Sequence, residues 1–345
     1  GHGLGAAPAT VTLEEGGRTV VDVPLRPEEV GEHAYRIDLT TPDGRVLTRE
    51  LRLTVQHTDP ETSRTSRFVL APGESYRLDD AALAGYRPGT ARAGLIAGAG
   101  AALDLPGLLL RLGAYPYGCT EQVASSLVPF LWAPDAADEL GLADAAEARE
   151  RVQAGIDRIL ARQDRTGAFG PWGGGGGSDP WLDAYATDVL LRAEAQGFDV
   201  PPTALRMALD RLRNHAAQAG QLHAGAEGAA YAFYVLARAG EAAIGDLRYY
   251  ADTLAERFDT PLAAAQLGAA LAGYGERERA DAMFARASAL ARTPGAEPGW
   301  RADYGTALRD RAGLLALAAE AGSGVVDRVR LASLVAQGGP AHRLS

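Results

Sequence analysis

The only cysteine of the 345-residue chain, Cys119, stands three positions before Gln122 in the stretch AYPYGCTEQVASS, residues 114–126. An apolar helical period begins there, directly after Tyr-Pro-Tyr-Gly, so we expect Cys119 at a helix N-terminus. Unpaired backbone N–H groups and the helix dipole stabilise a thiolate at that position. Residues at i and i+3 share a helix face, which lets the carboxamide of Gln122 approach the sulfur.

A thiolate that attacks the carboxamide carbon of Gln122 would expel ammonia and leave an internal thioester. Such a bond resists water only while it is buried, and Tyr115, Tyr117 and Trp132 are nearby aromatic residues that could cover it. Once exposed, it would acylate an amine or a hydroxyl. The alternative is a free cysteine that packs as a small hydrophobic residue, and the spacing alone is weak evidence against it.

The composition is that of a soluble globular protein with enough apolar residues for a large core, at 47% hydrophobic and 23% charged. The net charge of −10 argues against a general affinity for nucleic acid or anionic membranes. A single cysteine excludes an internal disulfide, and no run of 18 apolar residues could span a membrane. We find no cluster with metal-ligand spacing, so neither a metal nor a cofactor is expected.

Two periodicities divide the chain. Residues 10–55 hold short segments that alternate apolar and polar residues between turn-like sequences, and Asp43-Gly44 is a hairpin signal. Further strand-like segments follow at 67–78 and 91–100. This part of the chain predicts antiparallel β-structure.

From about Asp104 the apolar period changes to 3.6, with Gly or Pro at nearly every junction. Short loops between successive helices indicate antiparallel pairs in an α-solenoid or a closed α/α ring, and the lack of a fixed-length repeat favours the ring. The eleven expected helices are 104–114, 119–132, 146–162, 181–196, 203–217, 227–239, 246–257, 261–273, 277–291, 303–320 and 325–336.

Three stretches of the sequence can be compared with a known family. In chain order they are YPYGCTEQ, SDPWLDAYATDVLLRAEAQGFDVP at 178–201 and YGTALRDRAGLLALAAEAG at 304–322. The first resembles the Gly-Cys-x-Glu-Gln thioester motif of the α2-macroglobulin family, and its Tyr-Pro-Tyr prefix resembles the bacterial branch. The other two resemble later helices of the same family's thioester domain. Together they cover most of residues 104–345.

The resemblance implies a multidomain β + α fold. Residues 1–57 would be the C-terminal part of a macroglobulin-like β-sandwich domain, and 58–103 the first half of a CUB-like β domain. Residues 104–345 would be an incomplete α/α toroid, the thioester domain, with its last helix missing. On this reading the chain is a fragment of a longer protein.

The resemblance also assigns the site. Cys119 is implied as the sulfur donor and Gln122 as the acyl donor, with Gly118 and Glu121 completing the motif. Glu121 would have a positioning role, although a solvated glutamate favourable to the helix dipole is an equally good interpretation. Tyr115 and Tyr117 are the expected shielding residues.

Some members of the family use a histidine in acyl transfer, and His215 and His223 are the histidines in the middle of the expected toroid. No local motif distinguishes either, and we expect surface histidines. The glycine run 173–177 lacks the Lys-Ser/Thr of a P-loop, so it predicts a flexible loop. Asp179 is the expected N-cap of the next helix.

The family resemblance implies a broad-spectrum protease inhibitor and not an enzyme. A protease would cut a bait segment, the thioester would become exposed, and a lysine amine of the protease would be captured covalently. The resemblance further implies a periplasmic, membrane-anchored protein associated with a peptidoglycan synthase. Two alternatives stay open: a toroid scaffold without the thioester, and a toroid enzyme such as a glycosidase or lyase, which would need convergent carboxylates or a metal.

Overall fold

The chain forms two compact units in a computed structural model, Gly1–Phe68 and Val69–Ser345. The described residues are 3–4, 10–22, 24–26, 29–56, single positions between 58 and 68, 70–91, positions 93, 95, 108 and 112, and then 118–132, 145–175, 179–219, 226–292 and 301–338. Each unit is considered by itself.

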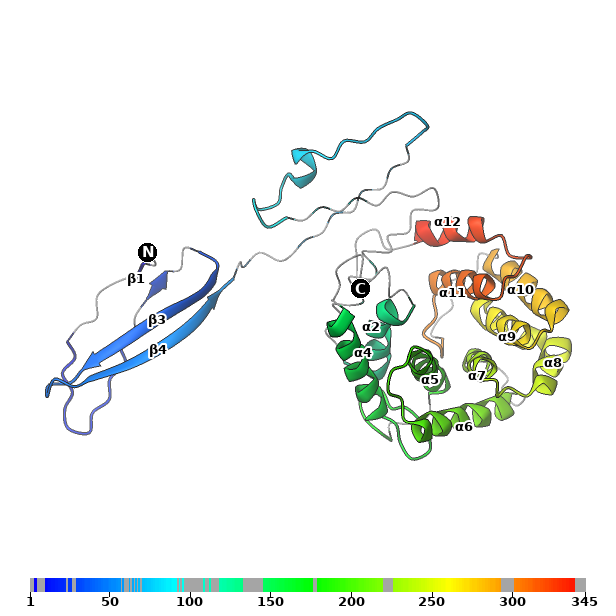
Figure 1. Ribbon diagram of the computed structural model, residues 1–345, viewed down its shortest axis with the longest axis horizontal. Helices are drawn as coiled ribbons and strands as arrows, with labels where there is room; N and C mark the ends of the chain where they lie inside the picture. The colour runs from blue at the N-terminus through cyan, green and yellow to red at the C-terminus, as the bar shows by residue number, and fades with distance from the viewer. Residues whose placement is uncertain are drawn as a thin grey trace. The chain divides into compact units, whose positions relative to one another are not determined.

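The first unit is built on one antiparallel hairpin. Strand β3 (Gly31–Thr40) pairs with β4 (Val46–Val55) over its whole length (Figure 1). The turn between them falls at Asp43-Gly44 as expected, and Gly44 adopts a φ of +82° that favours glycine. A second, minimal pair joins β1 (Gly3–Leu4) to β2 (Leu25–Arg26).

Several expected strands are not formed in the described residues. Positions 10–22 contain no strand, and the described positions of 67–78 contain none either, although a turn does occur at Pro72-Gly73. Alternation gives a segment a face that could be buried, but a strand forms only where a neighbour accepts its backbone hydrogen bonds. The expectation for these segments is therefore wrong here, and 91–100 lies almost wholly outside the described residues.

The second unit is helical, and ten α-helices lie in its described part. Ten of the eleven expected helices are thereby confirmed to within a few residues; the one expected at 104–114 lies almost wholly outside the described residues. The ten α-helices of the described residues are α2 (Thr120–Trp132), α4 (Ala145–Leu160), α5 (Pro180–Ala195), α6 (Pro202–Gln218), α7 (Glu227–Arg238), α8 (Ile244–Thr253), α9 (Pro261–Gly273), α10 (Arg277–Arg292), α11 (Ala307–Glu320) and α12 (Arg328–Gly338). Two short 3-10 helices, η1 (Asp80–Leu83) and η3 (Ala255–Arg257), are also present among these residues.

The start of α11 differs from the expected residue 303. Thr306 caps this helix, because its Oγ1 accepts a hydrogen bond from the backbone N–H of Arg309 at 3.2 Å. Asp303 instead lies buried in the preceding loop, where both of its carboxylate oxygens accept hydrogen bonds from Arg301. The apolar period alone could not distinguish this ordered loop from a first helical turn.

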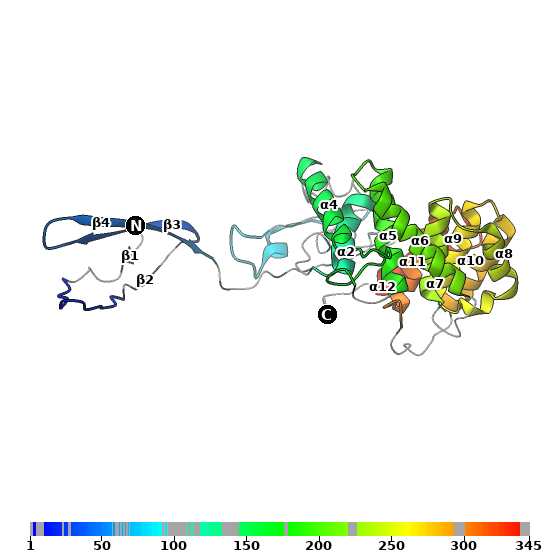
Figure 2. The same cartoon turned by 90° about the horizontal axis from the view of Figure 1, so that it is seen from below.

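The helices form two layers around a common centre (Figures 1 and 2). In the inner layer α2 packs on α5, α5 on α7, α7 on α9 and α9 on α11, while α4, α6, α8, α10 and α12 lie outside. The N-terminal ends of α5 and α7 adjoin, because a Cβ on Gly228 would lie 2.9 Å from Pro180. In the middle of α11, a Cβ on Gly313 would lie 2.4 Å from Leu262 at the start of α9, so these inner helices also approach closely.

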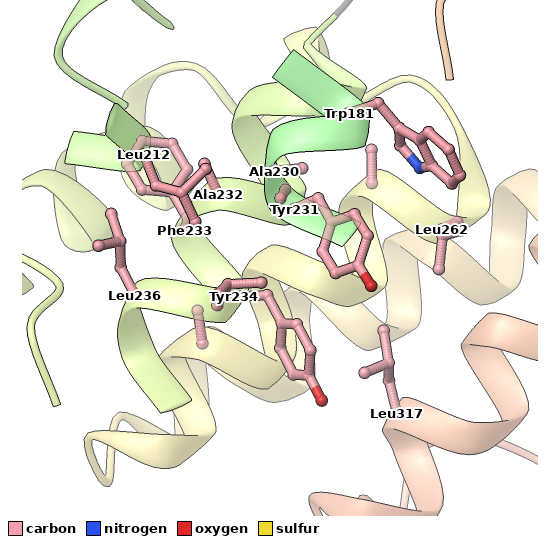
Figure 3. Packing of buried hydrophobic residues seen from close by; sticks show 14 of the residues in the cluster. Trp181, Leu212, Ala230, Tyr231, Ala232, Phe233, Tyr234, Leu236, Leu262 and Leu317 are labelled. Carbon is pink, nitrogen blue, oxygen red and sulfur yellow. The ribbon is translucent and has the colours of Figure 1, made fainter. Parts of the chain in front are cut away.

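The core lies between these layers. Helix α9 is buried around most of its circumference, as expected of an inner helix that is apolar on every side. Figure 3 shows aromatic side chains of α5 and α7, Trp181, Tyr231 and Tyr234, gathered near Leu262 and Leu317 of α9 and α11. Alanine and glycine at many inner positions allow the helices to approach closely.

Candidate functional site

The expected cysteine and glutamine lie together at the N-terminus of α2. Cys119 directly precedes the helix, and its backbone N–H donates to Oε1 of Gln122 at 3.1 Å. In return, the backbone N–H of Gln122 lies 3.4 Å from Sγ of Cys119. This is the reciprocal pattern of a capping box, with sulfur in the place of the usual serine or threonine hydroxyl.

The chemical consequence is that a thiol and a carboxamide are held on one turn, each beside a backbone N–H group. The thiol of Cys119 is half-buried, so reagents can reach it in part. The N–H of Gln122 can stabilise negative charge on the sulfur, and the N–H of Cys119 can do the same for negative charge on Oε1.

Thr120 anchors the start of α2 to the loop that precedes α5. It is fully buried, its backbone N–H donates to the Pro171 carbonyl at 2.8 Å, and its Oγ1 donates to the Gly170 carbonyl at 2.6 Å. The glycine run that begins at residue 173 therefore follows a segment fixed against the candidate site. Sequence reasoning expected only a flexible loop here and missed this role of Thr120.

Two arginines of α4 and the turn after it lie against the same backbone. A Cβ on Gly118 would come within 2.8 Å of Nη2 of Arg158, so a side chain there would collide with the guanidinium. Nη1 of Arg162 lies 3.3 Å from Oγ1 of Thr120. Burial lowers the pKa of Arg162 and so does the charge of Arg158, whereas the charge of Cys119 raises it.

Glu121 joins α2 to α5 through a hydroxyl. Ser125 Oγ donates to Oε1 of Glu121 at 2.7 Å and lies 3.0 Å from the hydroxyl of Tyr185. Burial raises the pKa of Tyr185 above its ordinary value, so the phenol stays protonated and available as a hydrogen-bond donor. The carboxylate of Glu121 is thus engaged within the domain and is more than a solvated first-turn residue.

Asp179 caps α5 as expected and also holds a tyrosine that sequence reasoning missed. Its Oδ1 accepts from the backbone N–H groups of Trp181 and Leu182, at 3.1 and 3.0 Å. Its Oδ2 accepts from the hydroxyl of Tyr304 at 2.8 Å, and the ring of Tyr304 meets that of Trp181 edge-on at 5.5 Å.

Tyr304 is an exposed residue with a left-handed backbone, at a φ of +56° that is rare for any side chain but glycine. The pKa of the Tyr304 hydroxyl is raised mainly by its hydrogen bond to Asp179. Burial and the charges of Asp179 and Cys119 raise it further. The tyrosine belongs to the stretch YGTALRD, which was the only sequence signal that could have identified it.

The expected aromatic cover from Trp132 is wrong. Trp132 ends α2, thirteen residues beyond Cys119, which places it about 20 Å from Cys119 along the helix axis. Its ring packs against Arg192, whose guanidinium carbon lies 4.4 Å from the ring centroid. The other two expected shielding residues, Tyr115 and Tyr117, lie outside the described residues.

His215 is not a surface histidine, and the expectation that it would be is wrong. Its side chain is 9% exposed, and Nε2 lies 2.8 Å from Oδ2 of the fully buried Asp183. The same carboxylate accepts from Nε of Arg211 at 3.2 Å and from the backbone N–H of Phe169 at 2.8 Å. His215 therefore belongs to a cluster that joins α6 to α5, and His223 lies outside the described residues.

Within the described residues no group of three or more His, Cys, Asp or Glu side chains could hold a metal ion. Over the same part of the chain, no helix combines the length and the apolar character that crossing a membrane requires.

Comparison with known proteins identifies the family. The model of the A-macroglobulin TED domain matches residues 98–228, which include Cys119 and Gln122. An alpha-2-macroglobulin of Xylella fastidiosa is 31% identical over 319 residues, and one of Escherichia coli is 31% identical over 332 residues. These alignments cover 89% and 91% of this chain. The chain belongs to the bacterial α2-macroglobulin family.

Solved structures of the family agree in fold. A native Escherichia coli alpha-2-macroglobulin, from domain MG7 to the C-terminus, matches 99% of this chain and 56% of its own, with a TM-score of 0.77 and 28% identity. A Salmonella alpha-2-macroglobulin reacted with methylamine matches 97% of this chain and 23% of its own, with a TM-score of 0.75 and 31% identity. An Escherichia coli alpha-2-macroglobulin activated by porcine elastase matches 91% of this chain and 30% of its own, with a TM-score of 0.57 and 27% identity.

The chain spans about a fifth of the length of its curated relatives, at 19% and 20% of the two described above. A helical thioester-type domain preceded by β elements is the part of the family architecture that the fold and the comparisons agree on.

Proposed function

We propose that Cys119 and Gln122 form an internal thioester, and that the chain is part of a broad-spectrum protease inhibitor. The observation that carries this proposal is the reciprocal pair of hydrogen bonds at the start of α2, which holds sulfur and carboxamide on one turn. The α2-macroglobulin relatives support it, because the family model spans both residues.

In the formation step, the thiolate of Cys119 attacks the side-chain carbonyl carbon of Gln122. A carbon–sulfur bond forms, negative charge develops on Oε1, and the carbon–nitrogen bond breaks as nitrogen takes up a proton and leaves as ammonia. The backbone N–H of Cys119 already donates to Oε1 at 3.1 Å and would stabilise that charge. The capping box thus supplies both proximity and an oxyanion donor.

In the capture step, a lysine amine of a protease attacks the same carbon, an amide bond forms, and sulfur leaves with the bonding electron pair. We propose that bait cleavage elsewhere in the protein exposes the bond. The structure of a relative described as activated by porcine elastase supports a protease as the trigger. His215 is occupied by Asp183, so we expect amines to react in preference to hydroxyls.

The wider setting is proposed from the family resemblance alone. It comprises an extracytoplasmic, periplasmic and membrane-anchored protein, and an association with a peptidoglycan synthase. The same resemblance suggests a macroglobulin-like domain at 1–57, half of a CUB-like domain at 58–103, and the α/α toroid from 104.

A scaffold without the thioester is the second candidate, and a specific observation favours it. A capping box stabilises a helix start whether or not its two side chains react, so the contacts of Cys119 and Gln122 have a purely structural interpretation. A toroid enzyme has no comparable support in the described residues.

Intact mass separates the two candidates. A thioester makes the chain lighter by one ammonia, and treatment of native protein with methylamine adds the mass of methylamine and releases one titratable thiol. Cys119→Ser is the matched control, because it keeps a capping side chain but cannot form the bond. An untreated chain of full mass, with its thiol already titratable, would replace the inhibitor proposal with the scaffold.

A further inference from the structure

Two arginines, Arg158 and Arg162, lie against the residues on either side of Cys119. Arg158, in the last turn of α4, lies against Gly118, since Nη2 would be 2.8 Å from a Cβ placed there. Arg162 follows four residues later, with Nη1 3.3 Å from Oγ1 of Thr120 and 3.4 Å from the Pro171 carbonyl. The residues that they contact are the immediate neighbours of Cys119 on either side.

The two guanidinium groups carry like charges close to the same backbone. Arg162 lies in the turn after α4, and the charge of Arg158 lowers the pKa of Arg162 in addition to the effect of burial. Within the described residues neither arginine forms an ion pair with a carboxylate. A negative charge on Cys119 would act on Arg162 in the opposite direction.

Two carboxylates near the site have hydrogen-bond partners other than these arginines. Glu121 accepts from Ser125, and Asp179 accepts from Tyr304 and from the backbone at the start of α5. In the described residues, neither carboxylate is hydrogen-bonded to Arg158 or Arg162.

We propose that Arg158 and Arg162 stabilise negative charge on Sγ of Cys119 and thereby promote both formation and opening of the thioester, an inference that rests on the proposed function. On opening, the amine nitrogen bonds to the carbonyl carbon of Gln122 and the carbon–sulfur bond breaks, with its electron pair going to sulfur. The proton released by the amine passes to water. A positive potential at the sulfur lowers the energy of that leaving group.

The first experiment uses a Gln122→Ala background, in which no thioester can form and Cys119 stays a thiol. Alkylation rates with iodoacetate, which is anionic, and iodoacetamide, which is neutral, are compared at low salt. Arg162→Gln should lower the iodoacetate-to-iodoacetamide ratio by roughly threefold, and the Arg158→Gln/Arg162→Gln pair should lower it further. Arg162→Lys should keep most of the ratio, because it keeps the charge.

The matched control is Arg279→Gln, which removes an arginine from α10 and should leave the ratio unchanged. Salt should reduce the ratio in the background protein and have little effect in the double variant, since mobile ions screen the attraction. An equal ratio in the background protein and the double variant overturns the inference. A lowered ratio in Arg162→Lys as well would show that side-chain packing is responsible, and it overturns the inference equally.

The second experiment measures methylamine-dependent release of the thiol with Gln122 intact, where Arg162→Gln should slow release by roughly threefold. The first experiment tests the role of the arginines and the second tests the thioester, so one part of the proposal can be contradicted without the other. A lowered alkylation ratio without any methylamine-released thiol keeps the charge effect and overturns the thioester. Thiol release together with an unchanged alkylation ratio keeps the thioester and overturns the role of the arginines.

Discussion

At the scale of single residues, Cys119 combines a structural role with a chemical one, and substitutions can separate them. Its sulfur completes the capping box of α2, a role that a serine or threonine hydroxyl usually has in this motif. We expect Cys119→Ser to leave the free energy of unfolding nearly unchanged. Cys119→Ala should lower it by about 1 kcal/mol, because the N–H of Gln122 loses its acceptor. Urea denaturation measures both.

Both substitutions should abolish incorporation of labelled methylamine, because neither leaves a nucleophilic sulfur. Equal labelling of wild type and Cys119→Ser would show that labelling does not depend on this residue. A stability loss in Cys119→Ser as large as in Cys119→Ala would show that the sulfur stabilises α2 by packing and not as a cap.

A second residue-scale prediction concerns Asp183, a fully buried carboxylate that holds His215, Arg211 and the N–H of Phe169. Asp183→Ala should lower the free energy of unfolding by about 3 kcal/mol, because it removes the shared acceptor of His215, of the half-buried Arg211 and of the backbone N–H of Phe169. Asp183→Asn keeps an acceptor for Phe169 and should cost less. Guanidinium denaturation followed by circular dichroism checks the order, and an equal loss in both variants would contradict it.

The sequence sufficed for those parts of the site that are local. Cys119 and Gln122 share one helical turn, so residue type and spacing were enough to predict that they meet. Arg162 reaches Thr120 at the start of α2, and Tyr304 reaches Asp179 at the start of α5, each from a distant part of the chain. No periodicity reports which loop will fold against which helix. Trp132 shows the converse error, because a residue close in sequence can lie at the far end of a helix.

At the scale of elements, an exposed charge network links the outer helices and predicts a pH dependence. Arg279 of α10 contacts Asp252 of α8 and also Glu276, which Arg248 of α8 contacts as well. Hydrogen bonds from arginine, to Asp252 from Arg279 and to Glu276 chiefly from Arg248, lower the pKa of both carboxyls. A lowered carboxyl pKa contributes stability above the unfolded-state value, and that stability is lost as the pH falls through the folded-state value.

We therefore expect Arg279→Gln to lower the melting temperature slightly at pH 7 and to have less effect at pH 3. Below about pH 4.5 the carboxyls begin to take up protons even in the unfolded chain, so the contribution of Arg279 fades. Thermal unfolding of both proteins at the two pH values measures this, with 1 M salt as a screening control. A difference between the proteins that grows toward low pH would contradict the assignment.

Helices were predictable where strands were not, and the reason is physical. A helix such as α9 satisfies its own backbone, so a run of apolar residues and a Thr260 cap are enough to place it. Residues 10–22 have comparable alternation, but a strand also needs a partner, and the described residues offer none. The late start of α11 follows from Asp303, whose pairing with Arg301 no periodicity could anticipate.

At the scale of the whole molecule, the two units differ in how they are held together. The second unit has a continuous core between two helical layers. In the first unit, β3 and β4 leave apolar side chains on the hairpin exposed, including Ile37 and Leu39, and only His33 on the hairpin is buried. An isolated two-stranded hairpin is marginally stable in water at best.

A chain that begins at Val69 should therefore keep the cooperative unfolding of the helical unit, with a melting temperature within about 3 °C of the complete sequence. The reason is that Gly1–Phe68 forms a separate unit, and its described residues include almost no buried core. Circular dichroism at a helix-sensitive wavelength measures the midpoint. The matched control removes α12 from the other end, which should lower the midpoint because Leu331 is buried within the core. A large loss on removing residues 1–68, equal to that on removing α12, would show that the hairpin stabilises the helical unit directly.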